Sequence, residues 1–187
     1  MKTKEPKIKQ FQNEFWKACA TDILILALNC VYFKDGYLYA SNAQVLIKQP
    51  LSQHHAFDGA HDILNDKYIH QSIFPYLKKA DIITFTEAGI RAKLLGKYAI
   101  TFEYETGVTN RIKYEHVVNN AMQKIKQASL IKKIAFNQLQ LQVLVDATKG
   151  IDTLAWEFAE PSQGVVITSG RSDIELFAIL SPCLINY

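Results

Sequence analysis

The densest group of side chains that could do chemistry lies in the segment 53–62, which reads Gln-His-His-Ala-Phe-Asp-Gly-Ala-His-Asp. Imidazole and carboxylate groups are the types that bind Zn²⁺ or Mn²⁺, and a bound ion can generate hydroxide for hydrolysis. The residues concerned are His54, His55, Asp58, His61 and Asp62. A metal-dependent hydrolase is therefore one hypothesis. The spacing matches no known metal motif, however, and a polar connecting loop is the other interpretation.

The remaining sequence has few groups that point to an enzyme. The three cysteines, Cys19, Cys30 and Cys183, lie far apart in apolar surroundings, which is typical of buried small hydrophobic residues in a reduced cytoplasm. No pair of them has the spacing of metal ligands. A Gly-rich phosphate loop, a Gly-x-Ser-x-Gly nucleophile turn and a paired-carboxylate motif are also missing from the sequence. We therefore expect no cofactor and no metal.

Length and charge limit the class of protein further. A chain of 187 residues with 49% apolar residues is long enough for one to one and a half domains with a proper core. Its longest apolar run, 23–28, is far below the roughly 20 residues of a membrane span, and no apolar segment directly follows the first lysines. We expect a cytoplasmic protein with no membrane partner. The net charge of +3 is unevenly distributed: residues 111–133 are basic and residues 150–187 are acidic.

Hydrophobic periodicity predicts a unit that occurs about three times, namely a short strand, a helix and three antiparallel strands. The first unit has an amphipathic helix at 8–19, strands at 28–33, 37–40 and 45–48, and a connector at 49–66. The second has a strand at 67–70, a helix at 72–80, and strands at 82–86, 90–95 and 98–104. The third follows a helix or linker at 114–127. It has a strand at 132–136, a helix capped by Asn137, and strands at 153–158, 164–168 and 176–180. The predicted fold class is α+β.

Three segments, in order along the chain, resemble the bacterial DNA polymerase sliding clamp. Residues 31–46, Val-Tyr-Phe-Lys-Asp-Gly-Tyr-Leu-Tyr-Ala-Ser-Asn-Ala-Gln-Val-Leu, stand where the family has a strand, a Gly turn and a strand ending in a run like Ala-Thr-Asp-Gly-His-Arg-Leu. Residues 67–118 resemble the next clamp unit, with Arg-Ile-Lys-Tyr at 111–114 in place of a Phe-Pro-Asp-Tyr-like segment. Residues 131–185 resemble the closing half of the last clamp domain, where the family's tail contains Met-Pro-Met. Asn42, Ala43, Gln44 and Val45 replace the family's Asp-Gly-His-Arg run.

The resemblance implies a division into a two-unit domain at 1–127 and a half-domain at 128–187. A half-domain leaves an open sheet edge and an uncovered helix face. The resemblance therefore implies self-association into a homo-oligomer, in which two half-domains combine or several chains close a ring.

The resemblance also implies two surfaces without catalytic chemistry. One holds duplex DNA through lysines that contact phosphates regardless of sequence, although these could equally be solvated surface residues. Its candidates are Lys9, Lys17, Lys78, Lys79, Lys124 and Lys126. The other is an apolar pocket for short peptides of replication or repair proteins, although these residues could also be core or a dimer seam. Its candidates are Leu144, Val145, Pro182, Cys183 and Leu184.

The sequence thus predicts a non-catalytic, sliding-clamp-like accessory factor that tethers other proteins to DNA or gives them processivity. A clamp-fold protein-interaction module that does not bind DNA is the first alternative. The metal-dependent hydrolase that uses residues 54–62 is the second.

Overall fold

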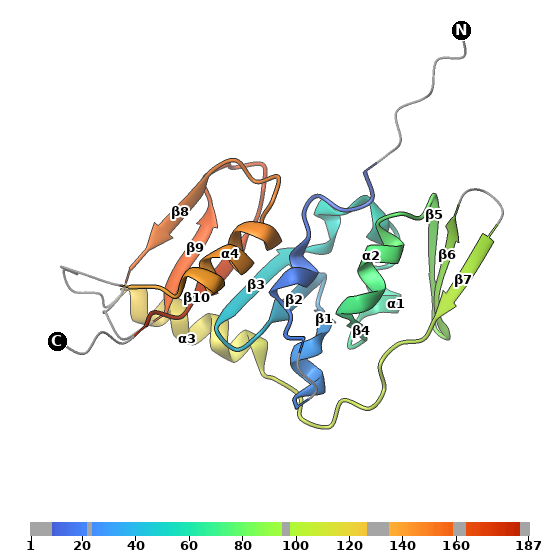
Figure 1. Ribbon diagram of the computed structural model, residues 1–187, viewed down its shortest axis with the longest axis horizontal. Coiled ribbons are helices and arrows are strands. Elements are labelled where there is room, and N and C mark those ends of the chain that lie inside the picture. Colours follow the sequence, from blue (N-terminus) through green and yellow to red (C-terminus); the bar gives the residue numbers. More distant parts are fainter. Residues whose placement is uncertain (1–8, 22–23, 95–97, 127–134, 159–163, 184–187) are drawn as a thin grey trace, which may run out of the picture.

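Two antiparallel sheets form the framework of the protein. A computed structural model describes residues 9–21, 24–94, 98–126, 135–158 and 164–183. Within them a seven-stranded sheet, the large sheet, has the order β4-β1-β2-β3-β10-β9-β8, and a three-stranded sheet, the small sheet, has the order β5-β6-β7 (Figure 1). The strands of the large sheet are β1 (Cys30–Lys34), β2 (Tyr37–Ser41), β3 (Val45–Pro50), β4 (Tyr68–His70), β8 (Leu154–Glu157), β9 (Val165–Ser169) and β10 (Phe177–Leu180). Those of the small sheet are β5 (Ile82–Thr86), β6 (Gly89–Leu94) and β7 (Tyr98–Phe102).

The helices are short, apart from two. The α-helices are α1 (His61–Leu64), α2 (Phe74–Leu77), α3 (Tyr114–Lys126) and α4 (Gln138–Ala147). The 3-10 helices are η1 (Phe15–Ala18), η2 (Leu26–Asn29), η3 (Leu51–Gln53), η4 (His55–Phe57) and η5 (Gln71–Ile73). None of the described helices has the length and apolar character needed to cross a membrane.

The large sheet joins segments that lie far apart in the sequence. Strand β3 of the first unit pairs antiparallel with β10 of the third, in the register Ile47↔Ala178. Strand β4, which opens the second unit, pairs with the outer edge of β1 in the register Tyr32↔Tyr68. The three predicted units are therefore interlocked through strand pairing.

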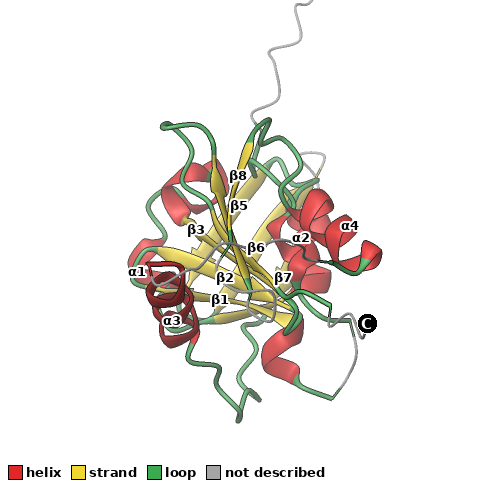
Figure 2. Cartoon of the chain, turned by 90° about the vertical axis from the view of Figure 1, so that its left-hand side faces the viewer, coloured by secondary structure: helices red, strands yellow, loops and turns green. Residues whose placement is uncertain are grey.

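Both faces of the large sheet are buried. Val31, Phe33 and Ile47 belong to a core that also contains residues of η1, α2 and α4. Their neighbours along the strands, such as Tyr32 and Leu46, belong to a second core with Tyr114 and Val118 of α3. Because successive strand residues point to opposite faces, these two cores lie on opposite sides of the sheet. Figure 2 shows α3 and α4 on opposite sides of the strands. We call the side with η1, α2 and α4 the helical face, and the other side the α3 face.

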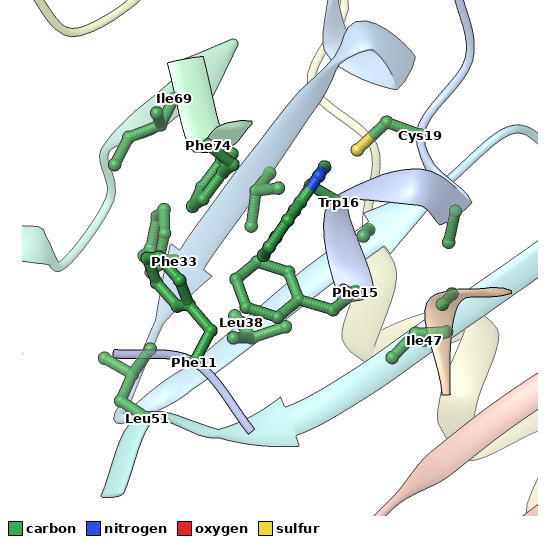
Figure 3. Packing of buried hydrophobic residues seen from close by; sticks show 14 of the residues in the cluster. Phe11, Phe15, Trp16, Cys19, Phe33, Leu38, Ile47, Leu51, Ile69 and Phe74 are labelled. Atoms are coloured by element: carbon green, nitrogen blue, oxygen red, sulfur yellow. The ribbon is translucent and has the colours of Figure 1, made fainter. Parts of the chain in front are cut away.

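The predicted helix at 8–19 is wrong except for one 3-10 turn, η1. The backbone N–H groups before it find other acceptors: that of Gln12 donates to Nδ1 of His54 at 3.1 Å, and that of Phe15 donates to the Asn13 side chain at 3.2 Å. The segment instead inserts Phe11, Phe15 and Trp16 into the core of the helical face (Figure 3). There Trp16 stacks on Phe74, with ring centroids 5.4 Å apart. Burial of large aromatic side chains outweighs the local preference for a helix.

Most other elements match the prediction to within a few residues. The described part of the predicted strand at 132–136 contains only a single bridge, Ala135↔Cys183. The predicted helix at 72–80 shortens to η5 and α2, and the connector at 49–66 contains η3, η4 and α1. Asn137 caps α4 as predicted, because its side chain accepts a hydrogen bond from the Leu139 N–H at 2.8 Å. The α+β class is confirmed.

Candidate functional site

The main candidate for a binding site is an apolar pocket on the α3 face, where the first and third units meet. It has a volume of about 530 Å³. We call it the junction pocket. It is lined mainly by Ile25, Leu28, Val45, Leu46, Ile112, Tyr114, Val117 and Ile179, with Ser41, Gln44, Asn110, Arg111 and Ser181 among its polar lining residues. Such a concave, mostly apolar surface with a few polar groups is typical of ligand sites.

The turn between β2 and β3 forms one wall of the junction pocket. Asn42 Oδ1 accepts hydrogen bonds from the backbone N–H groups of Gln44 at 3.1 Å and Val45 at 2.8 Å. Ser41 Oγ donates to the Val45 carbonyl at 2.8 Å and accepts from the Ala43 N–H at 3.1 Å. Ala43 has a φ of 73°, a left-handed conformation that an L-residue seldom adopts. The local side-chain bonds therefore hold a strained turn in a fixed shape.

Tyr114 fixes the start of α3 against the sheet beside the pocket. Its side chain is fully buried, and its ring stacks on Tyr39 with a centroid distance of 5.4 Å and on Tyr32 with 5.9 Å. Tyr32 in turn stacks on Tyr68 at 4.6 Å. Burial raises the pKa of the Tyr114 hydroxyl well above its usual value, so the ring stays neutral. Tyr114, the first residue of α3, thus packs against a row of tyrosines on the sheet, Tyr39, Tyr32 and Tyr68.

The second candidate surface is the helical face, where two of the predicted lysines converge on one carboxylate. Lys17 Nζ lies 2.7 Å from Glu14 Oε2, and Lys78 binds the other carboxylate oxygen of Glu14. Lys17 also lies 3.9 Å from Asp146 of α4. Hydrogen bonds from Lys17 and then Lys78 lower the pKa of the Glu14 carboxyl, which is charged at neutral pH. Positive and negative groups therefore alternate on this face.

The other predicted DNA-binding lysines do not form one surface. Lys9 donates from Nζ to the Gln12 carbonyl at 2.6 Å, and Lys79 is exposed after α2. Lys124 and Lys126 are exposed in the last turn of α3, on the opposite face of the large sheet. Lys124 and Lys126 therefore lie on the other face of the large sheet from Lys17 and Lys78.

The structure also separates the predicted peptide-pocket residues from the junction pocket. Leu144 is fully buried in the core of the helical face, and Val145 is exposed on α4 beside it. Both lie across the sheet from the pocket. Pro182 and Cys183 are half-buried just after the pocket residue Ser181, and Cys183 donates its N–H to the Ala135 carbonyl at 2.8 Å. Leu184 lies outside the described residues.

The sequence did contain a signal for the missed pocket. Runs such as 31–33, 45–47 and 165–167 are continuously apolar, a pattern of strands buried on both faces rather than on one. Tyr114, Val118, Ala121 and Ile125 supply the matching helical stripe. A helix covering the second face, and an apolar junction beside its first turn, could have been inferred from these two patterns.

The segment 53–62 does not bring its imidazole and carboxylate groups together. His54 is fully buried among aromatic rings, 4.9 Å from the ring centroid of Phe15. Burial, with a smaller effect of the nearby Lys9 charge, lowers the pKa of the His54 imidazole to about 3. His55 Nδ1 lies 2.6 Å from Asp58 Oδ2 in an exposed side-chain hydrogen bond. In the part of the chain that the structure describes, no three His, Cys, Asp or Glu side chains are placed to hold a metal ion.

Comparison with solved structures identifies the fold as that of bacterial DNA polymerase III beta sliding clamps. The Thermotoga maritima beta subunit superposes with a TM-score of 0.59 and 8% identity, over 97% of this chain and 63% of that one. A Bartonella birtlesii sliding clamp bound to griselimycin superposes with a TM-score of 0.59 and 14% identity, over 92% of this chain and 64% of that one. A Pseudomonas aeruginosa beta subunit superposes with a TM-score of 0.58 and 11% identity, over 91% of this chain and 62% of that one. The chain thus spans less than two thirds of these clamps. No family model matches it, and no curated protein sequence does.

Proposed function

We propose that this chain is a non-catalytic, sliding-clamp-like accessory factor of the cytoplasm that tethers partner proteins to duplex DNA. The observation that carries the proposal is the clamp fold, which extends over more than nine tenths of the chain. In this fold the β3·β10 pairing places η1, α2 and α4 side by side on one face, where flexible lysines can meet phosphates without reading bases. We retain the division into 1–127 and 128–187 and propose that the chain self-associates, although β10 of the second part already pairs with β3 of the first.

The junction pocket supports the second half of this function, the capture of a partner. Its apolar lining, its volume of about 530 Å³ and its rigid β2–β3 wall suit a short apolar peptide segment from a replication or repair protein. Arg111 and Asn110 at its border would give such a segment its orientation.

A clamp-fold interaction module that binds no DNA is the second candidate. The pairing of Lys17 and Lys78 with Glu14, and the approach of Asp146, favour it. Carboxylates that neutralise the lysines reduce the number of counterions that phosphates could displace, and so reduce the affinity for DNA.

Duplex binding decides between these two functions. We expect a fluorescently labelled duplex to show weak, sequence-independent anisotropy changes at about 50 mM salt that vanish by about 200 mM. Changing Lys9, Lys17, Lys78 and Lys79 together to glutamate should abolish the signal. For a match in charge, Lys17 and Lys78 changed to glutamate are compared with Lys124 and Lys126 changed to glutamate on the opposite face, and only the first pair should lose binding. A wild type that fails to bind at the lower salt concentration contradicts DNA tethering and leaves the interaction module.

The pocket can be tested separately with griselimycin, the compound bound to the Bartonella birtlesii clamp. We expect calorimetry to detect its binding, and Val117→Glu, at the exposed edge of the junction pocket, to weaken it by at least about tenfold. Val145→Glu is the control, since Val145 is similarly exposed on the helical face. Equal loss in both variants, or loss in Val145→Glu alone, would place the site elsewhere.

A further inference from the structure

A second pocket, polar where the junction pocket is apolar, lies beside the outer edge of β4. It has a volume of about 410 Å³. Its charged lining residues are the carboxylates Asp66, Glu87, Glu103 and Glu105 and the cations Lys67 and Arg111. We call it the acidic pocket, because negative side chains outnumber positive ones in its lining.

Three segments that are distant in the sequence build the walls of the acidic pocket. The segment 103–111, which follows β7, runs along β4, where the Glu105 N–H donates to the Tyr68 carbonyl at 2.9 Å. The turn between β5 and β6 closes the third side, where Glu87 Oε2 lies 3.1 Å from Lys67 Nζ. The pocket is therefore held by main-chain and side-chain bonds between these segments.

Two carboxylates of the acidic pocket have no cation of their own. Glu103 and Glu105 lie on either side of the buried Tyr104, and both line the pocket. Within the described residues Glu103 forms no ion pair or side-chain hydrogen bond. Glu105 Oε1 accepts only from the backbone N–H of Gly107, at 3.0 Å. Lys67 is already neutralised by Glu87, so it does not balance these two charges.

The hydroxyl of Tyr68 is a buried polar group that calls for a partner. Tyr68 lines the acidic pocket, is only 4% exposed, and its hydroxyl has no hydrogen-bond partner within the described residues. Buried hydroxyls nearly always have one. Burial raises the pKa of this hydroxyl, while the charges of Arg111 and Asp66, two other lining residues, act on it in opposite directions. The hydroxyl therefore stays neutral and can accept a hydrogen bond from a ligand in the pocket.

Arg111 connects the acidic pocket to the junction pocket, because it lines both. Both pockets also lie on the α3 face: Tyr68 and Val108 of the acidic pocket belong to the same core as Tyr114 of the junction pocket. A peptide that fills the junction pocket therefore needs only to pass Arg111 to enter the acidic one.

We propose that the partner peptide held in the junction pocket continues past Arg111 and places a lysine or arginine side chain in the acidic pocket. There the cation pairs with Glu103 and Glu105 and donates to the Tyr68 hydroxyl, in charge-assisted hydrogen bonds. This inference rests on the peptide capture in the proposed function. It names the partner's chemistry, which is an apolar segment with a basic residue beside it.

Other ligand classes fit the acidic pocket less well. An anion would meet four carboxylates, and only Arg111 lacks a carboxylate partner among the cations. A metal ion needs several ligands around one point. Within the part of the chain that the structure describes, no three His, Cys, Asp or Glu side chains are placed in that way. An organic cation, which needs fewer and more distant contacts, fits the geometry.

A small arginine derivative tests the acidic pocket alone. Titrating the full nitrogen-15-labelled chain with acetyl-arginine methylamide should shift the amide signals of 103–105 and 68, with a dissociation constant of about 1 mM, as expected for a fragment. The neutral citrulline analogue should shift none of them. Tyr68→Phe should weaken the arginine derivative about three- to tenfold, since it removes one hydrogen bond to a charged group. Equal shifts from both derivatives, or none from either, would overturn the cation site.

Peptides test whether one partner fills both pockets. Fluorescent acetyl-Arg-Gly-Leu-Leu-Leu amide and its reversed sequence present the cation on either side of an apolar block, and citrulline replaces arginine in the matched controls. In one of the two orders the arginine peptide should bind at least about tenfold more tightly than its citrulline control. Glu103→Gln with Glu105→Gln should remove this difference. Asp62→Asn with Glu157→Gln, which neutralises two exposed carboxylates outside the pocket, should preserve it.

The outcomes separate this inference from the proposed function. Equal affinities of arginine and citrulline peptides, or no binding of either, would overturn the continuous peptide, while griselimycin calorimetry judges the junction pocket independently. An arginine preference that survives Glu103→Gln with Glu105→Gln would place the cation elsewhere. Circular dichroism of each variant checks that it is folded.

Discussion

His54 accepts a hydrogen bond at Nδ1 from the backbone N–H of Gln12, at 3.1 Å, inside the aromatic core. This bond holds the irregular segment before η1 in place, so that Phe11 and Phe15 can pack against the rings of Phe57 and Phe74. The residue that was the first candidate for metal chemistry therefore organises the core.

The burial of His54 makes the stability of the fold depend on pH. Its folded pKa is about 3, whereas an unfolded histidine titrates near 6.5, so the unfolded chain binds a proton that the folded chain does not. Stability is therefore full above about pH 6.5 and falls as the pH decreases toward 3. We expect this residue alone to account for roughly 2 to 3 kcal/mol of loss at pH 4.5.

Denaturant unfolding between pH 7.5 and 4.5 measures this effect. His54→Leu should be less stable at pH 7.5, because the Gln12 N–H loses its acceptor, and should show a flatter pH profile. His55→Gln, which changes an exposed histidine, serves as the control. A His54→Leu profile as steep as that of the wild type would contradict the assignment.

Ala43 is a site where one substitution should stabilise the fold. Its left-handed φ of 73° strains any side chain, and the resemblance to sliding clamps puts glycine here. Removing the strain outweighs the extra freedom of glycine in the unfolded chain, so Ala43→Gly should raise the free energy of unfolding by up to about 1 kcal/mol. Urea unfolding gives this value. Gly36→Ala, at a φ of 78°, should have the opposite sign. Equal signs in the two variants would refute the strain argument.

Glu14 controls how much positive charge the helical face presents. Glu14→Gln removes the carboxylate that binds Lys17 and Lys78 while keeping the shape of the side chain. If the face binds DNA, the duplex affinity at low salt should rise by roughly three- to tenfold, and its dependence on salt should steepen because two more lysines are free to displace counterions. Anisotropy titrations at several salt concentrations measure both. Glu115→Gln, on the α3 face, is the charge-matched control. An unchanged affinity in Glu14→Gln would argue against a duplex on this face.

The sequence predicts repetition well and long-range burial poorly. The hairpin at Gly36, strand β5 and the Asn137 cap depend on local chemistry, and all three are found as predicted. The helix at 8–19 fails because its alternatives are tertiary: an acceptor on His54, 42 residues away, and a core that takes up three aromatic rings.

For the predicted sites too, local features could be predicted from the sequence, whereas contacts between distant segments could not. Glu14 and Lys17 have an i,i+3 spacing that the sequence shows, but the approach of Lys78 to Glu14, 64 residues away, was not visible from the spacing. From the resemblance, Leu144 was predicted to lie behind a peptide pocket near the C-terminus; the structure shows it fully buried in the core of the helical face, across the sheet from the junction pocket. Contacts between distant segments decide which face of the sheet a helix covers. Local periodicity in the sequence therefore does not predict that face.

Tyr114 connects the junction pocket to the stability of the α3 face, and its ring is the part that matters. The hydroxyl donates a long hydrogen bond of 3.4 Å to the Ala27 carbonyl, whereas the ring is fully buried against Tyr32 and Tyr39. Tyr114→Phe should therefore cost no more than about 1 kcal/mol and keep the pocket intact. Tyr114→Ala should cost roughly 3 to 5 kcal/mol, because it removes the ring from a stack that neighbouring residues cannot refill.

Urea unfolding and griselimycin calorimetry on the same two variants separate stability from binding. If the junction pocket binds griselimycin as proposed, Tyr114→Phe should bind it as the wild type does, because the ring still holds the first turn of α3 beside Ile112 and Val117. In buffer without urea, where circular dichroism shows that the variant is still folded, Tyr114→Ala should lose binding of the compound. The reason is that α3 no longer closes the wall of the junction pocket. Retained binding in Tyr114→Ala would mean that the compound contacts another surface, and a large stability loss in Tyr114→Phe would mean that the hydroxyl, rather than the stack, anchors α3.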